Sequence, residues 1–341
     1  IKGLSIQTVA GDPSNLAAGM IWYDSGSQKI QGAKLSVGAW ASGGNLNSAR
    51  SGVGGSGTQT ATLAFGGAAP GDPSGAMDEV ESYDGSSWTE TTDLNSRRYQ
   101  GGSIGQTQSD AAYCGGYSAP PPPLQSGKTE KWNGSSWTES GDLNSGRQGF
   151  FGGAGTTAAG LVAGSGPANG ATETFNGSAW TEVADLATAR QYAAVCGATS
   201  TAAMLVGGYG IPADSPYSNG PGSRVGITEI WDGTSWTHVS GTLNLGRIEA
   251  GLSGTTTEAV IAGGSTGDPA PPTANTATAE TWDGTSWTSV ASMSDIQADV
   301  GSSSSGGSTT AITYGGYPGG SVSSSEEWTG PLATAVTFTS S

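Results

Sequence analysis

Charged residues are scarce in this sequence, and so are the residue types on which much enzyme chemistry depends. Charged side chains make up 12% of the 341 residues, about half of what a typical soluble domain carries. The chain holds one histidine, His238, and two cysteines, Cys114 and Cys196. Two cysteines cannot form a disulfide framework, and one histidine excludes a two-histidine metal site. We therefore expect no structural metal, no cofactor, and two free, buried thiols, with His238 facing solvent.

Basic residues are also few, and no cluster of them exists. Lys and Arg number 12 against 28 acids, a net charge of −16. A nucleic-acid surface or an anionic membrane needs clustered cations, so the sequence predicts neither partner. No apolar run approaches the 18 or so residues of a membrane span. The sequence starts at Ile1, and residues 1–20 lack a signal-peptide pattern, which indicates either a removed leader or a piece of a longer protein.

Glycine and large aromatic residues are abundant instead. The chain has 59 Gly and 16 Pro, a fraction that can signal disorder, but it also has 11 Trp, 10 Tyr and 5 Phe. Large aromatics at regular spacing need a core in which to pack, and disordered chains have few of them. The sequence therefore predicts a folded chain.

A short element made of an aromatic residue, Asp or Asn, Gly, two small residues and Trp recurs along the chain. Its copies end at Trp88, Trp137, Trp180, Trp236 and Trp287. With Trp40 as a further closing tryptophan, the spacings are 48, 49, 43, 56 and 51 residues. Asp-Gly and Asn-Gly favour tight turns between antiparallel strands. Each copy therefore predicts a hairpin.

Two other features precede each hairpin. The first is an apolar run ending in a glycine pair, for which the third copy has Ala163-Gly164. The second is a Leu-x-x-x-Arg step, which the sixth copy replaces with Met293 and Gln297. The unit thus predicts four short strands: one after the arginine, one into the glycine pair, one into the first aromatic, and one from the closing tryptophan.

Four strands in about 45 to 50 residues are typical of a propeller blade. Five complete units are predicted at residues 49–95, 96–144, 145–187, 188–244 and 245–294. A sixth, at 295–329, ends at Glu326-Glu327-Trp328 without a closing tryptophan. Because Trp40 lacks a preceding strand of its own, we expect residues 38–47 to complete the sixth unit. The prediction is an all-β, six-bladed propeller closed by an N-terminal strand.

The order of glycine pair, Glu-x-aromatic, Trp and Leu-x-x-x-Arg resembles the kelch repeat. Every copy has the family's glutamate: Glu81, Glu130, Glu173, Glu229, Glu280 and Glu326. The departures are Ala163 in the third glycine pair and Gln297 at the sixth arginine position. The predicted organisation is an attachment or oligomerisation segment with a short β-hairpin at 1–37, the propeller at 38–330 and a C-terminal tail at 331–341.

The repeated arginines allow two interpretations. They are Arg50, Arg98, Arg147, Arg190 and Arg247. Since one glutamate accompanies each arginine, the first interpretation is a structural ion pair within the fold. The second is an anion-binding ring at the channel mouth, because five of the 12 cations in the chain occupy this position. Asp84, Asp232 and Asp283 are interpreted as turn residues rather than calcium ligands.

The connections between the second and third strands of the units are the most variable segments. They span residues 68–78, 117–128, 165–171, 209–225, 265–277 and 317–323. Variable loops on a rigid scaffold are typical of a recognition surface. Four tyrosines in them offer flat, amphipathic rings suited to sugars or peptides: Tyr117, Tyr209, Tyr217 and Tyr317.

Catalysis is not expected. Some kelch propellers are copper oxidases, but that metal site needs more than the single His238. A glycosidase needs a pair of carboxylates, and no pair that breaks the repeat stands out within one loop. The sequence predicts a binding protein without catalytic residues.

A second resemblance concerns the style of the repeat and the segment Gly19-Met20-Ile21-Trp22-Tyr23-Asp24 with the strand that follows it. Both are similar to kelch-repeat structural proteins of marine bacteriophages. This resemblance implies a multi-copy tail or appendage protein on the virion surface. Residues 1–37 would contact other virion proteins, and the propeller would contact a host-surface glycan or protein. The alternative is a secreted bacterial kelch lectin or glycan-processing protein.

Overall fold

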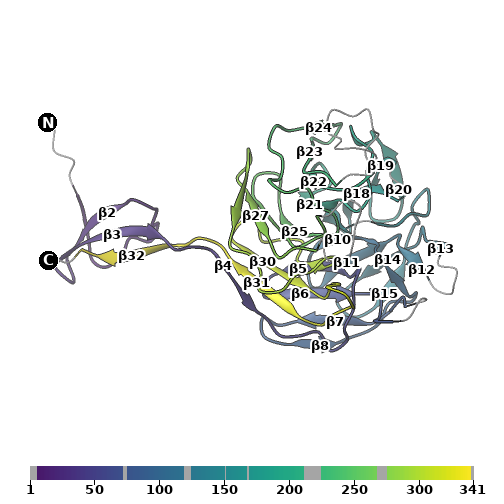
Figure 1. Ribbon diagram of the computed structural model, residues 1–341, viewed down its shortest axis with the longest axis horizontal. Coiled ribbons are helices and arrows are strands. Elements are labelled where there is room, and N and C mark those ends of the chain that lie inside the picture. The colour runs from purple at the N-terminus through teal and green to yellow at the C-terminus, as the bar shows by residue number, and fades with distance from the viewer. Residues whose placement is uncertain are drawn as a thin grey trace. The chain divides into compact units, whose positions relative to one another are not determined.

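The computed structural model describes residues 6–71, 75–118, 124–149, 151–166, 169–210, 224–266 and 275–338. Every regular element in these ranges is a β-strand (Figure 1). The chain divides into two compact units: Ile1–Ala39 with Thr329–Ser341 forms the first, and Trp40–Trp328 forms the second. Within the described ranges, no helix has the length and apolar character needed to cross a membrane.

The repeat of the second unit folds as four antiparallel strands in chain order. In the first copy these are β5 (Gly54–Thr58), β6 (Ala61–Phe65), β7 (Val80–Tyr83) and β8 (Trp88–Glu90). The next copies have β10 (Gly102–Thr107), β11 (Asp110–Cys114), β14 (Thr129–Trp132) and β15 (Trp137–Glu139), and then β17 (Ala154–Thr156), β18 (Ala159–Ser165), β19 (Asn169–Phe175) and β20 (Trp180–Val183). Two more follow with β21 (Ala194–Thr199), β22 (Ala202–Val206), β23 (Thr228–Trp231) and β24 (Trp236–His238), and with β25 (Gly251–Gly254), β26 (Ala259–Ala262), β27 (Ala279–Trp282) and β28 (Trp287–Val290).

The last sheet of the second unit draws on both of its ends. Its strand order is β29 (Gly301–Ser302), β30 (Thr310–Tyr314), β31 (Ser325–Thr329) and β4 (Ala39–Ser42). Strand β4 occupies the place that the closing tryptophan strand has in the other sheets. Its Trp40 packs on Trp328 of β31, with ring centroids 5.5 Å apart.

The turn between the third and fourth strands shows why Asp-Gly recurs. Tyr83 and Trp88 are opposite each other in the ladder, and Gly85 between them has φ of +92°, which favours glycine. The Asp84 carboxylate accepts the backbone N–H groups of Ser86 and Ser87 at 2.9 and 2.8 Å. These hydrogen bonds, that of the Ser87 N–H most of all, lower the pKa of Asp84 to about 2. The interpretation of this aspartate as a turn residue agrees with its geometry.

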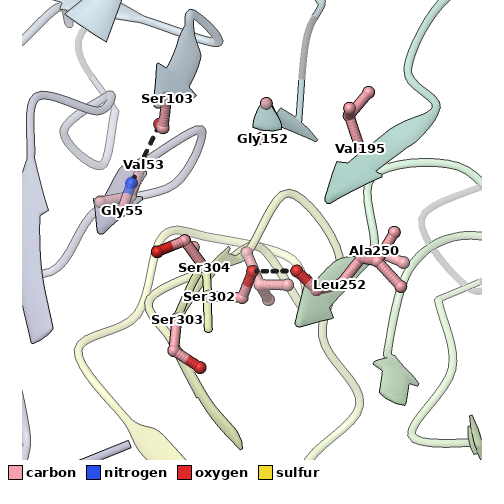
Figure 2. A pocket seen from close by; sticks show the side chains of 13 residues that line it. Val53, Gly55, Ser103, Gly152, Val195, Ala250, Leu252, Ser302, Ser303 and Ser304 are labelled. Atoms are coloured by element: carbon pink, nitrogen blue, oxygen red, sulfur yellow. Dashed lines mark hydrogen bonds between the residues drawn. The ribbon is translucent and has the colours of Figure 1, made fainter. Parts of the chain in front are cut away.

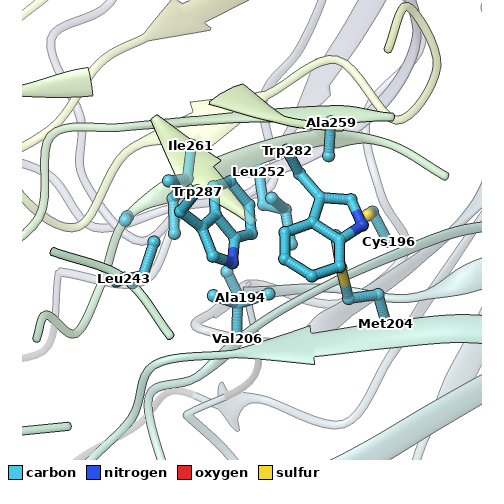
Figure 3. Close-up of a cluster of buried hydrophobic side chains, with 11 residues drawn as sticks. Ala194, Cys196, Met204, Val206, Leu243, Leu252, Ala259, Ile261, Trp282 and Trp287 are labelled. Atoms are coloured by element: carbon cyan, nitrogen blue, oxygen red, sulfur yellow. The ribbon is translucent and has the colours of Figure 1, made fainter. Parts of the chain in front are cut away.

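The core lies between neighbouring sheets. Figure 3 shows Trp282 and Trp287 of one sheet packed against Cys196 and Met204 of the preceding one. The indole N–H of Trp287 also donates to Thr228 of the preceding sheet at 2.9 Å. The indole N–H groups of Trp88, Trp137, Trp180 and Trp236 are also bonded, whereas the buried N–H of the closing Trp40 has no acceptor among the described residues. Both cysteines are free and buried, as predicted.

The glycine pairs make a backbone link from each sheet to the next. The second residue of each pair donates its N–H to the carbonyl of the next copy's arginine or glutamine. The six links are Gly67 to Arg98, Gly116 to Arg147, Ser165 to Arg190, Gly208 to Arg247, Gly264 to Gln297 and Gly316 to Arg50, at 2.7 to 3.3 Å. The last of them joins the sheet of β29–β31 to that of β5–β8.

The third pair corrects the sequence prediction. Gly164 has φ of +70°, close to the +63° of Gly66, the first glycine of the first pair. The pair is therefore Gly164-Ser165, and Ala163 is not part of it. Ser165 makes the link to Arg190 that a glycine makes elsewhere, so the departure falls one residue later, at the second position.

The first unit is a separate four-stranded sheet of order β1 (Gln7–Val9), β2 (Ile21–Asp24), β3 (Lys29–Leu35) and β32 (Ala333–Thr337). Strands β2 and β3 form an antiparallel hairpin, and β1 pairs with β2 in parallel. Strand β32 pairs antiparallel with β3. The sequence separates residues 1–37 from a tail at 331–341, whereas the structure joins the two ends in one sheet.

Candidate functional site

Each of the five repeated arginines is buried against the glutamate of its own copy of the repeat. The shortest N–O distances are 2.6 Å for Arg50–Glu81 and Arg147–Glu173 and 2.8 Å for Arg98–Glu130 and Arg247–Glu280, and Arg190 contacts Glu229 in the same way. The Arg50 guanidinium also donates to the carbonyls of Gly66 and Glu79. Desolvation lowers the pKa of the buried Arg50, and the Glu81 charge opposes this effect.

This geometry supplies the reason to prefer the structural interpretation of the arginines. Their side chains are at most 2% exposed and donate to groups within the sheet. The glutamates in turn accept the N–H of the residue after the repeated leucine, as Glu81 does from Asn47 at 2.7 Å. An anion-binding role for these arginines stays a prediction that the geometry does not favour.

His238 does not face solvent as the sequence predicts. Its Nε2 lies 2.9 Å from the Thr188 hydroxyl and 3.3 Å from Glu229. In other copies an asparagine side chain binds this glutamate, as Asn47 binds Glu81, but Ala187 stands at that position here. The imidazole therefore replaces the missing amide. The sequence feature that could have predicted this role of His238 is the Leu-Ala pair of this copy, where other copies have Leu-Asn.

A narrow cavity lies among the first strands of the repeat copies. Figure 2 shows its lining, to which every copy of the repeat contributes, including Val53, Ser103, Val195, Leu252 and Ser302. The cavity has a free volume of about 20 Å³, which is room for about one water molecule. A ligand larger than water therefore has to bind at an end of this cavity rather than inside it.

A ring of backbone hydrogen bonds, here called the mouth ring, lies next to the cavity, because three of its members directly precede the lining residues Val53, Ala250 and Val300. It consists of the residues two positions after the repeated arginine or glutamine: Gly52, Gln100, Gly149, Tyr192, Glu249 and Asp299. Each donates its N–H to the carbonyl of the preceding member at 2.8 to 3.0 Å, and Gly52 donates to Asp299. All six have positive φ, between +55° and +79°.

Four of these positions carry side chains despite that backbone conformation. Positive φ is uncommon for residues other than glycine, and such residues cluster at functional sites. Gly52 and Gly149 show that glycine serves equally well in the ring. The side chains of Gln100, Tyr192, Glu249 and Asp299 therefore point to a role beyond the backbone.

The two acids of the mouth ring are adjacent and share their surroundings. Asp299 accepts a hydrogen bond from Gln100 at 3.1 Å, while the Glu249 carboxylate makes no hydrogen bond within the described part of the chain. Desolvation, followed by the charge of Asp299, raises the pKa of Glu249 to about 8. Desolvation also raises the pKa of Asp299. The pair comes from two different loops, whereas the sequence search found no acid pair within one loop.

Around the mouth ring lies a second set of residues, here called the outer tier. Each of them directly follows a glycine pair: Ala68, Tyr117, Gly166, Tyr209, Ser265 and Tyr317. Five pair with the residue just before a mouth-ring member, as Tyr117 of β12 (Tyr117–Ser118) pairs with Tyr99 of β9 (Arg98–Tyr99). In the sixth sheet the N–H of Tyr317 donates to Ala298.

The outer tier brings together three of the four predicted tyrosines. Tyr117, Tyr209 and Tyr317 alternate with the small residues Ala68, Gly166 and Ser265, so every second sheet presents a tyrosine. Tyr117 stacks on Tyr99 with ring centroids 5.3 Å apart. Tyr192 of the mouth ring is a neighbour of Tyr117, and its pKa is raised to about 12, mainly by desolvation. Tyr217 lies outside the described residues.

The same face is hollowed beside Tyr317. A groove of about 700 Å³ is lined by residues that include Asn275, Ile296, Gln297 and Pro318. The side chain of Asn275 donates to the backbone carbonyl of Tyr317. This groove coincides with the sheet whose repeated arginine is replaced, where Gln297 bonds Ser324 at 2.7 Å. Among the described residues, no group of three His, Cys, Asp or Glu side chains is arranged to hold a metal ion.

Comparison with known proteins supports the fold. No protein-family model and no curated protein matches the chain. Solved structures do match, and they include one described as "Structure of YjhT". That structure is 14% identical, with a TM-score of 0.65, and the match covers 85% of this chain and 99% of that one. At this identity the likeness concerns the fold alone, and the chain has an all-β, propeller-like fold.

Proposed function

We propose that this protein is a six-bladed kelch-type propeller that binds a neutral glycan, without catalysis, on the face formed by the mouth ring and the outer tier. The observation that carries the proposal is the outer tier, in which three tyrosines alternate with small residues around a polar ring. Tyrosine rings pack on the apolar faces of sugars, and their hydroxyls accept and donate hydrogen bonds.

Two sets of links support six blades closed by β4. The backbone links from glycine pair to arginine run from each sheet to the next and from the last to the first. The mouth ring repeats this connection with six members. Strand β4 lies beside β31 in the last sheet, so both ends of the second unit contribute to one blade.

The charge of this face supports a neutral ligand. Glu249 and Asp299 lie in the mouth ring, and the chain as a whole carries −16. An anionic ligand would meet the net negative charge of the chain, whereas sugar hydroxyls can bond the two carboxyl groups, the Gln100 amide and the tyrosine hydroxyls. The groove beside Tyr317, at about 700 Å³, is within the usual size of a small-molecule site.

The acid pair favours one second candidate, a glycan-processing enzyme. Glycosidases use two carboxyl groups, one of them with a raised pKa that keeps it protonated as the general acid. Glu249 has such a pKa. Incubation of the protein with an oligosaccharide that it binds separates the candidates: the binding protein returns the oligosaccharide intact, and the enzyme cleaves it in a reaction that Glu249→Gln abolishes.

From the resemblance to phage appendage proteins we further propose that this binding activity belongs to a virion surface, where the ligand would be a glycan of the host. Residues 1–37 would then join the propeller to other virion proteins. Mass spectrometry of purified particles tests this location, since a virion protein is present at a fixed ratio to the capsid protein. A chain found only in culture medium, free of particles, would instead be the secreted lectin.

The glycan site is tested with the purified full chain on a glycan array, followed by calorimetry with the strongest hit. We expect Tyr117→Ala and Tyr317→Ala each to weaken binding about tenfold, since one aromatic contact supplies roughly 0.5–1.5 kcal/mol beyond its buried area. The matched control is Leu35→Ala, an exposed apolar side chain in the first unit. Equal binding by all three variants, or no glycan bound, would overturn the proposal.

A further inference from the structure

Exposed apolar side chains are concentrated in the first unit. In the described part of the chain, eleven large apolar side chains are exposed, and eight of them belong to this small sheet. They are Ile6, Ile21, Tyr23, Ile30, Leu35, Val37, Leu332 and Phe338. Contiguous apolar patches on the surface mark interaction sites. The question is therefore whether these side chains lie together on one face of the sheet.

The strand register places four of them on one face. Tyr23 of β2 is opposite Ile30 of β3, and Ile21 is opposite Gly32. Directly opposed residues share a face, and so do residues two apart in one strand. Phe338 follows β32, donates its N–H to Ile30 and has its ring against Gly32. Ile21, Tyr23, Ile30 and Phe338 therefore form one surface, here called the apolar face, and each is 36–55% exposed.

The opposite face cannot by itself stabilise the sheet. The buried apolar side chains of the described part of this unit are Trp22 and Ala33. Small domains with so little core usually need disulfides, metals or oligomerisation. Both cysteines of the chain lie in the second unit. Covering the apolar face is the remaining way to add buried surface to this sheet.

Charge distribution indicates where copies of the chain can approach one another. The first unit has three lysines and two aspartates, a net charge of +1, which leaves −17 in the second unit. Contact through two second units would oppose like charges, whereas the apolar face has only Lys34 beside it. The face therefore meets an identical face at little electrostatic cost.

We propose that the apolar face is the interface between two copies of this chain, packed face to face about a two-fold axis. Both ends of the chain build this sheet, so each copy brings the complete surface, as a self-complementary contact requires. Ile21, Tyr23, Ile30 and Phe338 of one copy cover the same residues of the other. This inference is independent of any ligand at the mouth.

The oligomeric state of the full chain tests the proposal by light scattering after size exclusion and by sedimentation. We expect a dimer for the natural sequence. Ile30→Glu should weaken self-association at least about 100-fold, because dimerisation would bury an unpaired charge. The matched control is Leu35→Glu in the same strand on the other face, where the side chain is 55% exposed. It should leave the dimer intact.

A second variant keeps the test decisive if Ile30→Glu disrupts the sheet. In Tyr23→Cys the new thiol lies on the apolar face, while Cys114 and Cys196 are buried. A short bis-maleimide should cross-link Tyr23→Cys into covalent dimers, and Leu35→Cys should form no covalent dimer under the same conditions. A monomeric natural chain without cross-linking, or a dimer that survives Ile30→Glu, would overturn the proposal. The first outcome would assign the face to a different partner.

Discussion

The backbone N–H of Gly52 donates to the carbonyl of Asp299 at 2.8 Å, joining residues from the first and last sheets of the second unit. This hydrogen bond completes the mouth ring, which otherwise connects only sheets that follow one another in the chain. Each member is held by two neighbours, so the position of any one side chain depends on all six sheets. The proposed site is in this sense a property of the whole second unit.

Removal of β4 should destabilise the second unit far more than removal of the first unit. Deletion of residues 1–44 uncovers Trp328, which stacks on Trp40, and removes the Gly44 carbonyl that accepts the indole N–H of Trp88 at 2.8 Å. We expect the melting temperature to fall by at least about 10 °C. The control deletes residues 1–37 and 331–341 and keeps β4. Equal melting temperatures for the two truncations would contradict closure by β4.

Breaking one buried ion pair should be costly. Arg98→Met leaves Glu130 buried without its partner, which lies at 2.8 Å with both side chains fully buried. We expect a loss of about 3–5 kcal/mol in the free energy of unfolding, measured by urea denaturation. Lys128→Met provides the comparison, because Lys128 and Glu139 form a 2.7 Å pair on the surface. That variant should unfold like the natural protein. A similar loss of stability in Arg98→Met and Lys128→Met would mean that burial of the ion pair is not the cause of the loss.

Much of the second unit follows from the sequence because its determinants are local and repeated. Gly85 and Trp88 specify a hairpin within six residues, and the copies of this element confirm one another. The arginine and glutamate of one sheet are also predictable partners, since each copy has one of each. Arg50 and Glu81, for example, are 31 residues apart and 2.6 Å apart in space.

The sequence does not predict the mouth ring, because the six copies have glycine twice and four different side chains at this position, with no shared pattern. Tyr192, Glu249 and Asp299 become neighbours only when three sheets are assembled. One sequence feature could have predicted them. Each lies two residues after the repeated Arg190, Arg247 or Gln297, and the residue at this position varies although the residues around it are repeated. The pairing of β32 with β3 was missed for a related reason, since neither strand belongs to the repeat.

The two thiols should be inert in the folded protein. Burial raises the pKa of Cys114 to about 12, and it raises the pKa of Cys196 as well. Only the thiolate is nucleophilic, and neither sulfur is accessible. We expect no reaction with Ellman's reagent at neutral pH until urea unfolds the chain, when both thiols should react. Rapid labelling of either cysteine in the native protein would show that its sheet opens.

Glu249 should make the protein less stable as the pH rises from about 5 to 8. Desolvation first, and then the charge of Asp299, raises its pKa from 4.5 to about 8, against the opposing charge of Arg224. In this range the native protein holds a proton that the unfolded chain has released, so stability falls with increasing pH. Glu249→Gln removes this carboxyl group. Urea denaturation between pH 5 and 8 should show that the free energy of unfolding of Glu249→Gln, relative to that of the natural protein, increases with pH. Glu258→Gln, an exposed position in the same sheet, should leave the pH dependence unchanged. Parallel profiles for the natural protein and Glu249→Gln would show that Glu249 is ionised in the native mouth ring, and the raised pKa would be wrong.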